Sequence, residues 1–239
     1  MNIADSVVIV TGASSGLGLE CARQLTDRSA RVYGLARRGE RLQAVENELG
    51  SGFTGIVCDV REEESVKKAV SHIVEREERI DVLINNAGLG VFGSVVDLTA
   101  AEWDTMMDTN LRGLFFCTKA VVPVMKKQNA ASGFGGHIVN IASIAGLLGN
   151  PSISGYNASK FGVRGFSDAT MKELRGDGIK VSCVYPGSIR TEFSDVADSN
   201  IAANPMTAAD VASTVVHVLD TSDNYLVSEV VMRPLRPRG

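Results

Sequence analysis

The strongest constraint on the fold of this chain is a regular alternation of short apolar runs with segments of helical length. Strand-like runs recur at Val7–Val10, Val32–Leu35, Ile56–Cys58, Val82–Ile84, Ile138–Ile141, Val181–Tyr185 and Leu226–Met232. Most of them are continuously apolar, which is typical of parallel strands that are covered on both faces. Helical segments are expected between them, at about 16–28, 39–49, 62–78, 100–129, 156–175 and 208–220. Repeated β–α units predict an α/β fold with a doubly wound parallel sheet of about seven strands and helices on both faces.

The bulk properties narrow the class of protein. The 239 residues are 44% hydrophobic and 22% charged, as in ordinary soluble proteins, and we expect one domain over residues 1–239. The net charge is −4 and the sequence shows no cluster of basic residues that would form a basic face, so a nucleic-acid partner is not expected. No apolar stretch reaches the ~18 residues of a membrane span. The four cysteines form no metal-binding pattern with histidines. We therefore expect a cytoplasmic protein with no metal site and no membrane partner.

A glycine-rich turn follows the first strand and opens the first helix. Its glycines lie in the spacing G-x-x-x-G-x-G, which differs from the commoner G-x-G-x-x-G fingerprint. Such a turn lets the backbone approach a pyrophosphate, and the helix N-terminus favours its negative charge. The alternative is a tight structural turn. The position after the first strand favours a dinucleotide site formed by Gly12, Ser14, Ser15, Gly16, Leu17 and Gly18.

The ends of the later strands supply further candidate cofactor contacts. Arg37 and Arg38 follow the second strand, and no acid occurs before Glu40. An acid at this place would hold a ribose 2′-hydroxyl, whereas arginine accommodates a 2′-phosphate, so NADP(H) is favoured over NAD(H). The alternative is an exposed helix start. The other candidates at strand ends are Asp59, Val60, Asn86, Ala87 and Gly88, followed after the sixth strand by Pro186, Gly187, Ile189 and Thr191.

Tyr156 and Lys160 are four residues apart and so share one face of the predicted helix 156–175. Ser143 lies at the end of the fifth strand, thirteen residues before the tyrosine. A hydroxyl, a phenol and an ammonium brought together could protonate a carbonyl oxygen. An ammonium ~4 Å from a phenol would lower the phenol's pKa from about 10 by roughly three units, toward neutrality. Taken alone, a tyrosine and a lysine at this spacing are typical of an exposed helix surface, and a serine such as Ser143 is typical of a loop cap.

Taken in order, the motifs identify a family. TGASSGLG at 11–18, NNAG at 85–88, Asn110, Ser143, YxxxK at 156–160 and PGxxxT at 186–191 resemble the short-chain dehydrogenases/reductases. The resemblance implies a Rossmann-type fold, a nicotinamide cofactor, and catalytic roles for Asn110, Ser143, Tyr156 and Lys160. It also implies that Lys160 bonds the cofactor ribose and that Asn110 holds a water linking Lys160 to solvent. Dimers or tetramers formed through segments 100–129 and 156–175 are expected on the same ground.

The sequence therefore predicts an NADP(H)-dependent oxidoreductase that interconverts a carbonyl and a secondary alcohol on a small molecule. The alternatives are an NAD(H)-dependent alcohol dehydrogenase of the same fold and a cofactor-binding sensor or scaffold without turnover. Substrate choice is expected in the loop 144–155, and the segment 191–205, where the family often carries a lid, is short. An apolar pocket, or ordinary core packing, is expected of Leu89, Val91, Phe92, Ile144, Leu148 and Phe193.

Overall fold

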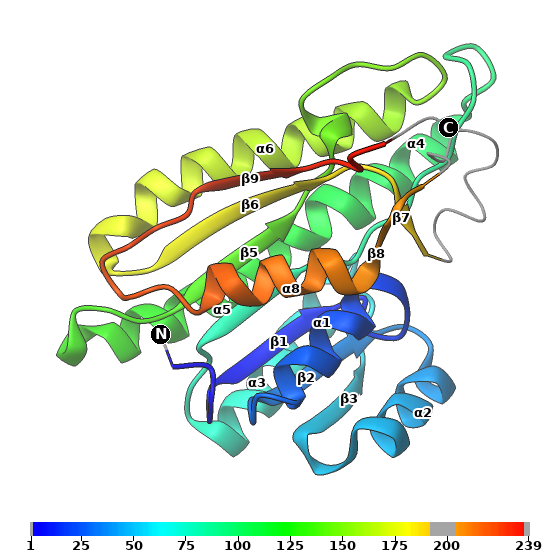
Figure 1. Cartoon of the computed structure of the whole chain (residues 1–239). Coiled ribbons are helices and arrows are strands. Elements are labelled where there is room, and N and C mark those ends of the chain that lie inside the picture. The colour runs from blue at the N-terminus through cyan, green and yellow to red at the C-terminus, as the bar shows by residue number, and fades with distance from the viewer. Residues whose placement is uncertain (1, 192–203, 237–239) are drawn as a thin grey trace.

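A computed structural model describes residues 2–191 and 204–236, and it contains the predicted parallel sheet (Figure 1). The sheet has seven strands in the order β3-β2-β1-β4-β5-β6-β9, and every neighbouring pair is parallel. The strands are β1 (Val7–Thr11), β2 (Arg31–Ala36), β3 (Phe53–Val57), β4 (Val82–Asn85), β5 (His137–Ile141), β6 (Lys180–Pro186) and β9 (Glu229–Met232). The reversal of strand order between β1 and β4 is the point at which doubly wound sheets bind ligands.

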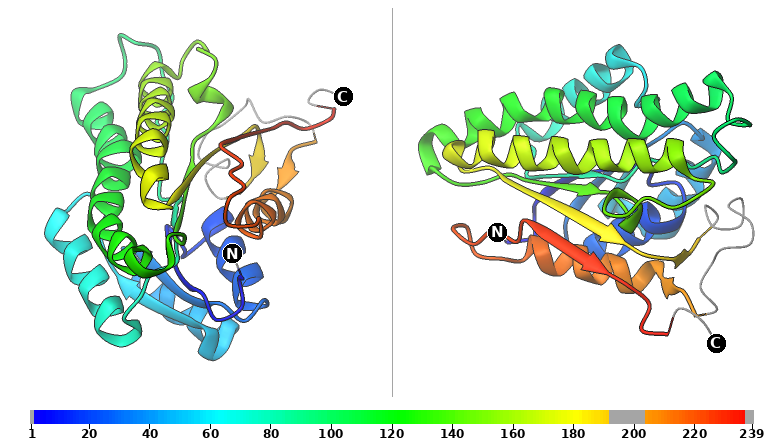
Figure 2. Two further views of the ribbon diagram at one scale, coloured as in Figure 1. Left: turned by 90° about the vertical axis from the view of Figure 1, so that its left-hand side faces the viewer. Right: turned by 90° about the horizontal axis from the view of Figure 1, so that it is seen from above.

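Helices cover both faces of this sheet (Figure 2). They are α1 (Gly16–Thr26), α2 (Gly39–Leu49), α3 (Glu63–Glu77), α4 (Ala100–Met107), α5 (Gly113–Ser132), α6 (Ser154–Leu174) and α8 (Ala208–Leu219). The first main core cluster joins α1, α2 and α8 to one face of the sheet. The second joins α3 and α5 to the opposite face, and a smaller cluster lies under α6. The predicted fold class is confirmed.

Four details differ from the prediction. The long segment 100–129 is not one helix, because a π-helical turn at Asp108–Arg112 separates α4 from α5. The last strand begins at Glu229 and not at Leu226, and β3 begins three residues earlier than expected. A small parallel pair, β7 (Ile189–Arg190) with β8 (Met206–Thr207), was not predicted because strands of two residues carry no periodic pattern. Phe193 and most of the segment 191–205 lie outside the described residues.

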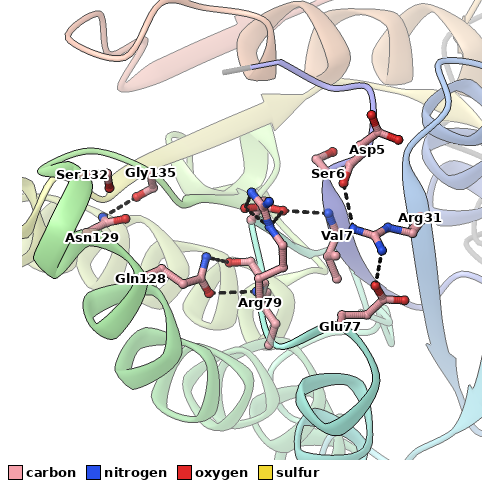
Figure 3. A network of polar contacts seen from close by, with 12 residues as sticks. Asp5, Ser6, Val7, Arg31, Glu77, Arg79, Gln128, Asn129, Ser132 and Gly135 are labelled. Carbon is pink, nitrogen blue, oxygen red and sulfur yellow. Dashed lines mark hydrogen bonds and ion pairs between the residues drawn. The ribbon is translucent and has the colours of Figure 1, made fainter.

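The amino ends of the strands are joined by polar contacts (Figure 3). The Asp81 carboxylate accepts a hydrogen bond from the Val7 backbone N–H at 2.8 Å and forms an ion pair with Arg79 at 2.7 Å. The Gln128 side chain bonds both backbone groups of Ile80, at 2.8 and 3.1 Å. Arg31 bridges Glu77 and the Asp5 carbonyl. These contacts fix the edge opposite to the one where the sequence motifs lie.

The register brings the motifs together at the carboxyl edge of the sheet. Asn85 is paired with Asn140 across β4 and β5, and Pro186 is paired with Met232 across β6 and β9. Residues that follow these positions therefore meet at one edge, as expected for parallel strands. Within residues 2–191 and 204–236 no helix is long and apolar enough to cross a membrane, and no group of three or more His, Cys, Asp or Glu side chains could hold a metal ion.

Candidate active site

The glycine-rich turn is held in a conformation that requires glycine. Gly12 and Gly16 have φ angles of +69° and +57°, in the left-handed region that side chains disfavour. A Cβ on Gly18 would lie 2.4 Å from the Gly12 carbonyl oxygen. Ser15 begins α1 without a side-chain cap, so the N–H groups of the first turn are left for another acceptor. This arrangement fits a dinucleotide pyrophosphate.

Thr11, which the sequence analysis did not single out, joins this turn to the loop after β4. Its hydroxyl accepts hydrogen bonds from the backbone N–H groups of Asn86 and Ala87, both at 2.9 Å. The Asn86 side chain in turn donates to the Thr11 carbonyl at 2.9 Å. The predicted cofactor residue Asn86 therefore uses its amide to fix the two loops together. The position of Thr11 directly before the first glycine of the motif could have indicated a role for it. Its partner Asn86, however, lies 75 residues later in the chain, so the sequence pattern does not reveal the contact.

Two arginines lie at the end of β2, as predicted. Arg38 donates to the hydroxyls of Ser14 and Ser15 at 3.1 and 3.0 Å, so it reaches across to the glycine-rich turn. Asp59 forms an ion pair with Arg61 at 2.6 Å. Hydrogen bonds from Arg61 lower the pKa of Asp59, and the charge of Arg37 contributes in the same direction. The charged groups therefore gather where the adenosine end of a dinucleotide would bind.

The three predicted catalytic groups of the loop and helix also meet. The Ser143 hydroxyl follows β5, accepts from the Ala145 N–H at 3.1 Å, and hydrogen-bonds Tyr156. Lys160 is 5% exposed, and its Nζ donates to the Ile141 carbonyl at 2.9 Å. That Nζ lies 5.7 Å from the centroid of the Tyr156 ring. An ammonium has three donors, so donors remain for a further partner such as ribose hydroxyls.

Burial controls the titration of this pair. It raises the pKa of Tyr156 to about 12, although the Ser143 hydrogen bond acts in the opposite direction. It lowers the pKa of Lys160 to about 8, because the ammonium loses its hydration. The expectation that Lys160 would bring the phenol near neutrality is not met, because burial has the largest effect on the pKa of Tyr156 and raises it. Tyr156 therefore keeps its proton at neutral pH.

Asn110 lies within the π-helical turn and is 1% exposed. Its Oδ1 accepts from the Leu89 N–H at 2.8 Å, and its Nδ2 donates to the Leu89 carbonyl at 2.8 Å and the Ser159 hydroxyl at 2.9 Å. A Cβ on Gly88 would lie 3.2 Å from Asn110 Oδ1 and 3.6 Å from Lys160 Nζ. The amide thus fixes the loop after β4 against α6, beside the lysine.

Asn157, also missed at the sequence level, holds the loop between Ser143 and Tyr156. Its side chain is buried and donates to the carbonyls of Ala145 and Leu148 at 2.6 and 2.8 Å. It also accepts from the Asn150 N–H at 3.1 Å. One residue next to the tyrosine therefore sets the path of the loop in which substrate choice is expected.

The turn after β6, at residues 186–191, lies at the same carboxyl edge of the sheet and contacts both Ser143 and the glycine-rich turn. The Gly187 N–H donates to the Met232 carbonyl at 2.9 Å, and the Pro186 carbonyl lies 3.4 Å from the Ser143 hydroxyl. Ile189 packs against the first core cluster. A Cβ on Gly16 would lie 3.5 Å from the Cβ of Thr191, which places this turn against the glycine-rich turn. Leu17 and Val60 are buried, the latter against Gly113.

Known proteins share this fold and these motifs. The family model for short-chain dehydrogenases matches residues 6–202. A serine 3-dehydrogenase of Agrobacterium fabrum is 33% identical, with 95% of this chain and 93% of the relative covered. The closed form of serine dehydrogenase complexed with NADP+ has a TM-score of 0.88 and 31% identity over 96% of this chain and 95% of that one. A metagenomic short-chain oxidoreductase in complex with NADP has a TM-score of 0.84 and 32% identity, with 98% and 99% covered.

These matches confirm the resemblance that the motifs indicated, and they extend over almost the whole chain. The chain belongs to the short-chain dehydrogenases, a family of NAD(P)-dependent oxidoreductases.

Proposed function

We propose that this protein is an NADP(H)-dependent oxidoreductase that interconverts a carbonyl and a secondary alcohol. The observation that carries the proposal is the convergence of Ser143, Tyr156 and Lys160 beside the glycine-rich turn, at the switch point of the sheet. A bound nicotinamide coenzyme supplies or accepts the hydride, and the protein orients the reacting carbon.

Each residue has a separate task in this proposal. Ser143 donates a hydrogen bond to the carbonyl oxygen and positions it. Tyr156 donates the proton that converts this oxygen into a hydroxyl, and its raised pKa means that the proton is present at neutral pH. Lys160, held by the Ile141 carbonyl beside the Tyr156 ring, bonds the ribose hydroxyls of the coenzyme. Asn110 positions the loop after β4 beside Lys160, on the route by which the proton is replaced.

Arg37 and Arg38 support the preference for NADP(H). Their guanidinium groups can form charge-assisted hydrogen bonds with a 2′-phosphate, which NAD(H) lacks. Two solved relatives are complexes with NADP+ or NADP. We expect fluorescence titration to give a Kd for NADPH at least about tenfold below that for NADH, and the double variant Arg37→Ser/Arg38→Ser to remove this difference. The matched control Arg28→Ser/Arg175→Ser changes two charges away from the turn.

A wild-type preference for NADH would contradict the assignment of Arg37 and Arg38.

A turnover assay on the wild-type protein tests the alternative of a sensor or scaffold. Incubation of ketones and 3-oxoacyl thioesters with NADPH, and of hydroxy acids with NADP+, is expected to show oxidation or reduction of the coenzyme. Tight binding of NADPH without consumption across the panel would favour a sensor or scaffold over an enzyme.

We also propose a homodimer or homotetramer. Large side chains on α4, α5 and α6 are partly exposed: Trp103 is 40%, Phe115 is 41% and Phe161 is 42% exposed. The helices α5 and α6 run side by side in both views of Figure 2, so their outer surfaces form one face. Burying such side chains between copies would be favourable. We expect light scattering to give a mass of two or four chains, and Phe115→Glu/Phe161→Glu to shift it toward one; a monomeric wild type would contradict this proposal.

A further inference from the structure

The ring of Phe92 lies against the ring of Tyr156. The centroids are 5.8 Å apart and the planes are inclined by 72°, an edge-to-face contact. Phe92 is 36% exposed, so part of its ring is in contact and part is open. Because the two rings are in contact, a substrate bound at the Tyr156 phenol lies close to Phe92.

The loop that carries Phe92 is fixed on both sides of it. The Val91 N–H points to the Met106 sulfur at 3.3 Å, and the Gly93 N–H donates to the Ser152 carbonyl at 2.8 Å. Ser152 has a φ angle of +63°, an unfavourable conformation for serine, and so holds its carbonyl in a particular direction. This contact joins the loop after β4 to the loop before α6. The backbone on both sides of Phe92 is consequently fixed, and its ring packs against the ring of Tyr156.

The loop before α6 carries another exposed apolar side chain. Leu148 is 53% exposed, and its carbonyl is held by Asn157, the neighbour of Tyr156. A Cβ on Gly93 or Gly149, the residues that follow Phe92 and Leu148, would meet nothing within 4 Å, so the backbone next to both side chains is open. Each loop thus carries a large, partly exposed apolar side chain, and the hydrogen bond from Gly93 to Ser152 joins the two loops.

We propose that Phe92 is a specificity-determining residue, and that it selects carbonyl compounds that carry an aryl or branched alkyl group. The inference rests on the function proposed above. An aromatic substituent would gain contact with the open part of the Phe92 ring and with Leu148. A substrate that places ammonium and carboxylate groups against these two side chains would lose hydration without gaining a charged partner there. We therefore expect serine to be a poorer substrate for this chain than an aryl ketone.

The test compares three methyl ketones of increasing size, acetone, 2-hexanone and acetophenone, with NADPH as the coenzyme, and L-serine with NADP+. In the wild type we expect kcat/KM to rise from acetone to acetophenone and to exceed that for serine. In Phe92→Ala the ratio of kcat/KM for acetophenone over acetone is expected to fall about tenfold, mainly through KM. The control is Phe134→Ala, since Phe134 is 47% exposed and follows α5, near the amino end of β5.

Phe92→Leu is a second variant that keeps a large apolar side chain at this position. Its ratio of kcat/KM for acetophenone over acetone is expected to fall less than that of Phe92→Ala. An unchanged ratio in both variants would overturn the proposal, as would a wild type that prefers serine to every ketone. These outcomes leave the proposed oxidoreductase intact, because turnover is still observed. A wild type that binds NADPH but reduces none of the ketones and oxidises no alcohol would instead contradict the proposed function itself.

Discussion

Tyr156→Phe is expected to lower kcat for carbonyl reduction by about 10²–10⁴-fold, the usual contribution of a general acid. The substitution removes one oxygen and leaves the ring in contact with Phe92, so the pocket keeps its shape. The Kd for NADPH is expected to change less than about twofold, since Lys160 keeps its bond to Ile141. Steady-state kinetics and coenzyme titration on the same preparation measure both quantities. The matched control is Tyr225→Phe, because Tyr225 is 59% exposed and lies far along the chain from the motifs.

The pH dependence provides an independent check of the same residue. Alcohol oxidation needs the phenolate, and burial raises the pKa of Tyr156 to about 12, so at neutral pH the phenol is almost wholly protonated. The ionised fraction of such a group increases about tenfold per pH unit below its pKa. We therefore expect kcat/KM for alcohol oxidation to rise from about pH 7 to pH 10, and the rise to be absent in Tyr156→Phe. Wild-type turnover in that variant would show that another group moves the proton.

The sequence predicted the sheet and its functional edge because both depend on local pattern. Continuous apolar runs such as those at Val7–Val10 and Val82–Ile84 mark buried parallel strands, and parallel strands must end at a common edge. Spacing alone also placed Tyr156 and Lys160 on one face of a helix. These predictions needed no knowledge of which side chains meet across the fold.

The parts that were missed depend on contacts between distant segments. Asn110 lies in a π-helical turn, and its side chain forms hydrogen bonds with Leu89 and Ser159, which are 21 and 49 residues away. Thr11 acts through partners 75 and 76 residues away. The pKa of Tyr156 depends on how completely the fold removes it from water, and no spacing reports this. Local patterns therefore locate the site, whereas burial and long-range hydrogen bonds set its chemistry.

Gly18→Ala is expected to weaken NADPH binding at least about 100-fold and to lower the free energy of unfolding by about 1–3 kcal/mol, the usual effect of overpacking. The added Cβ would lie 2.4 Å from the Gly12 carbonyl oxygen and 2.5 Å from Asn86 Nδ2. Neither group can move freely. The Gly12 N–H is bonded to the Leu35 carbonyl at 2.7 Å, and Asn86 is bonded to Thr11. Relief of the clash must therefore displace the turn that we assign to the pyrophosphate.

Gly165→Ala is the matched control, because it makes the same substitution within a helix where the new Cβ would meet nothing within 4 Å in its own chain. Gly165 lies one helical turn after Phe161, so the mass of this variant is also measured by light scattering. There the higher helix propensity of alanine is expected to increase the free energy of unfolding by up to about 1 kcal/mol, with NADPH binding unchanged. Denaturant unfolding and coenzyme titration of both variants separate the two effects. Opposite signs for the two stability changes would show that close packing, and not helix propensity, is the reason for glycine at position 18. If Gly18→Ala bound NADPH as tightly as the wild type, the pyrophosphate could not depend on this turn.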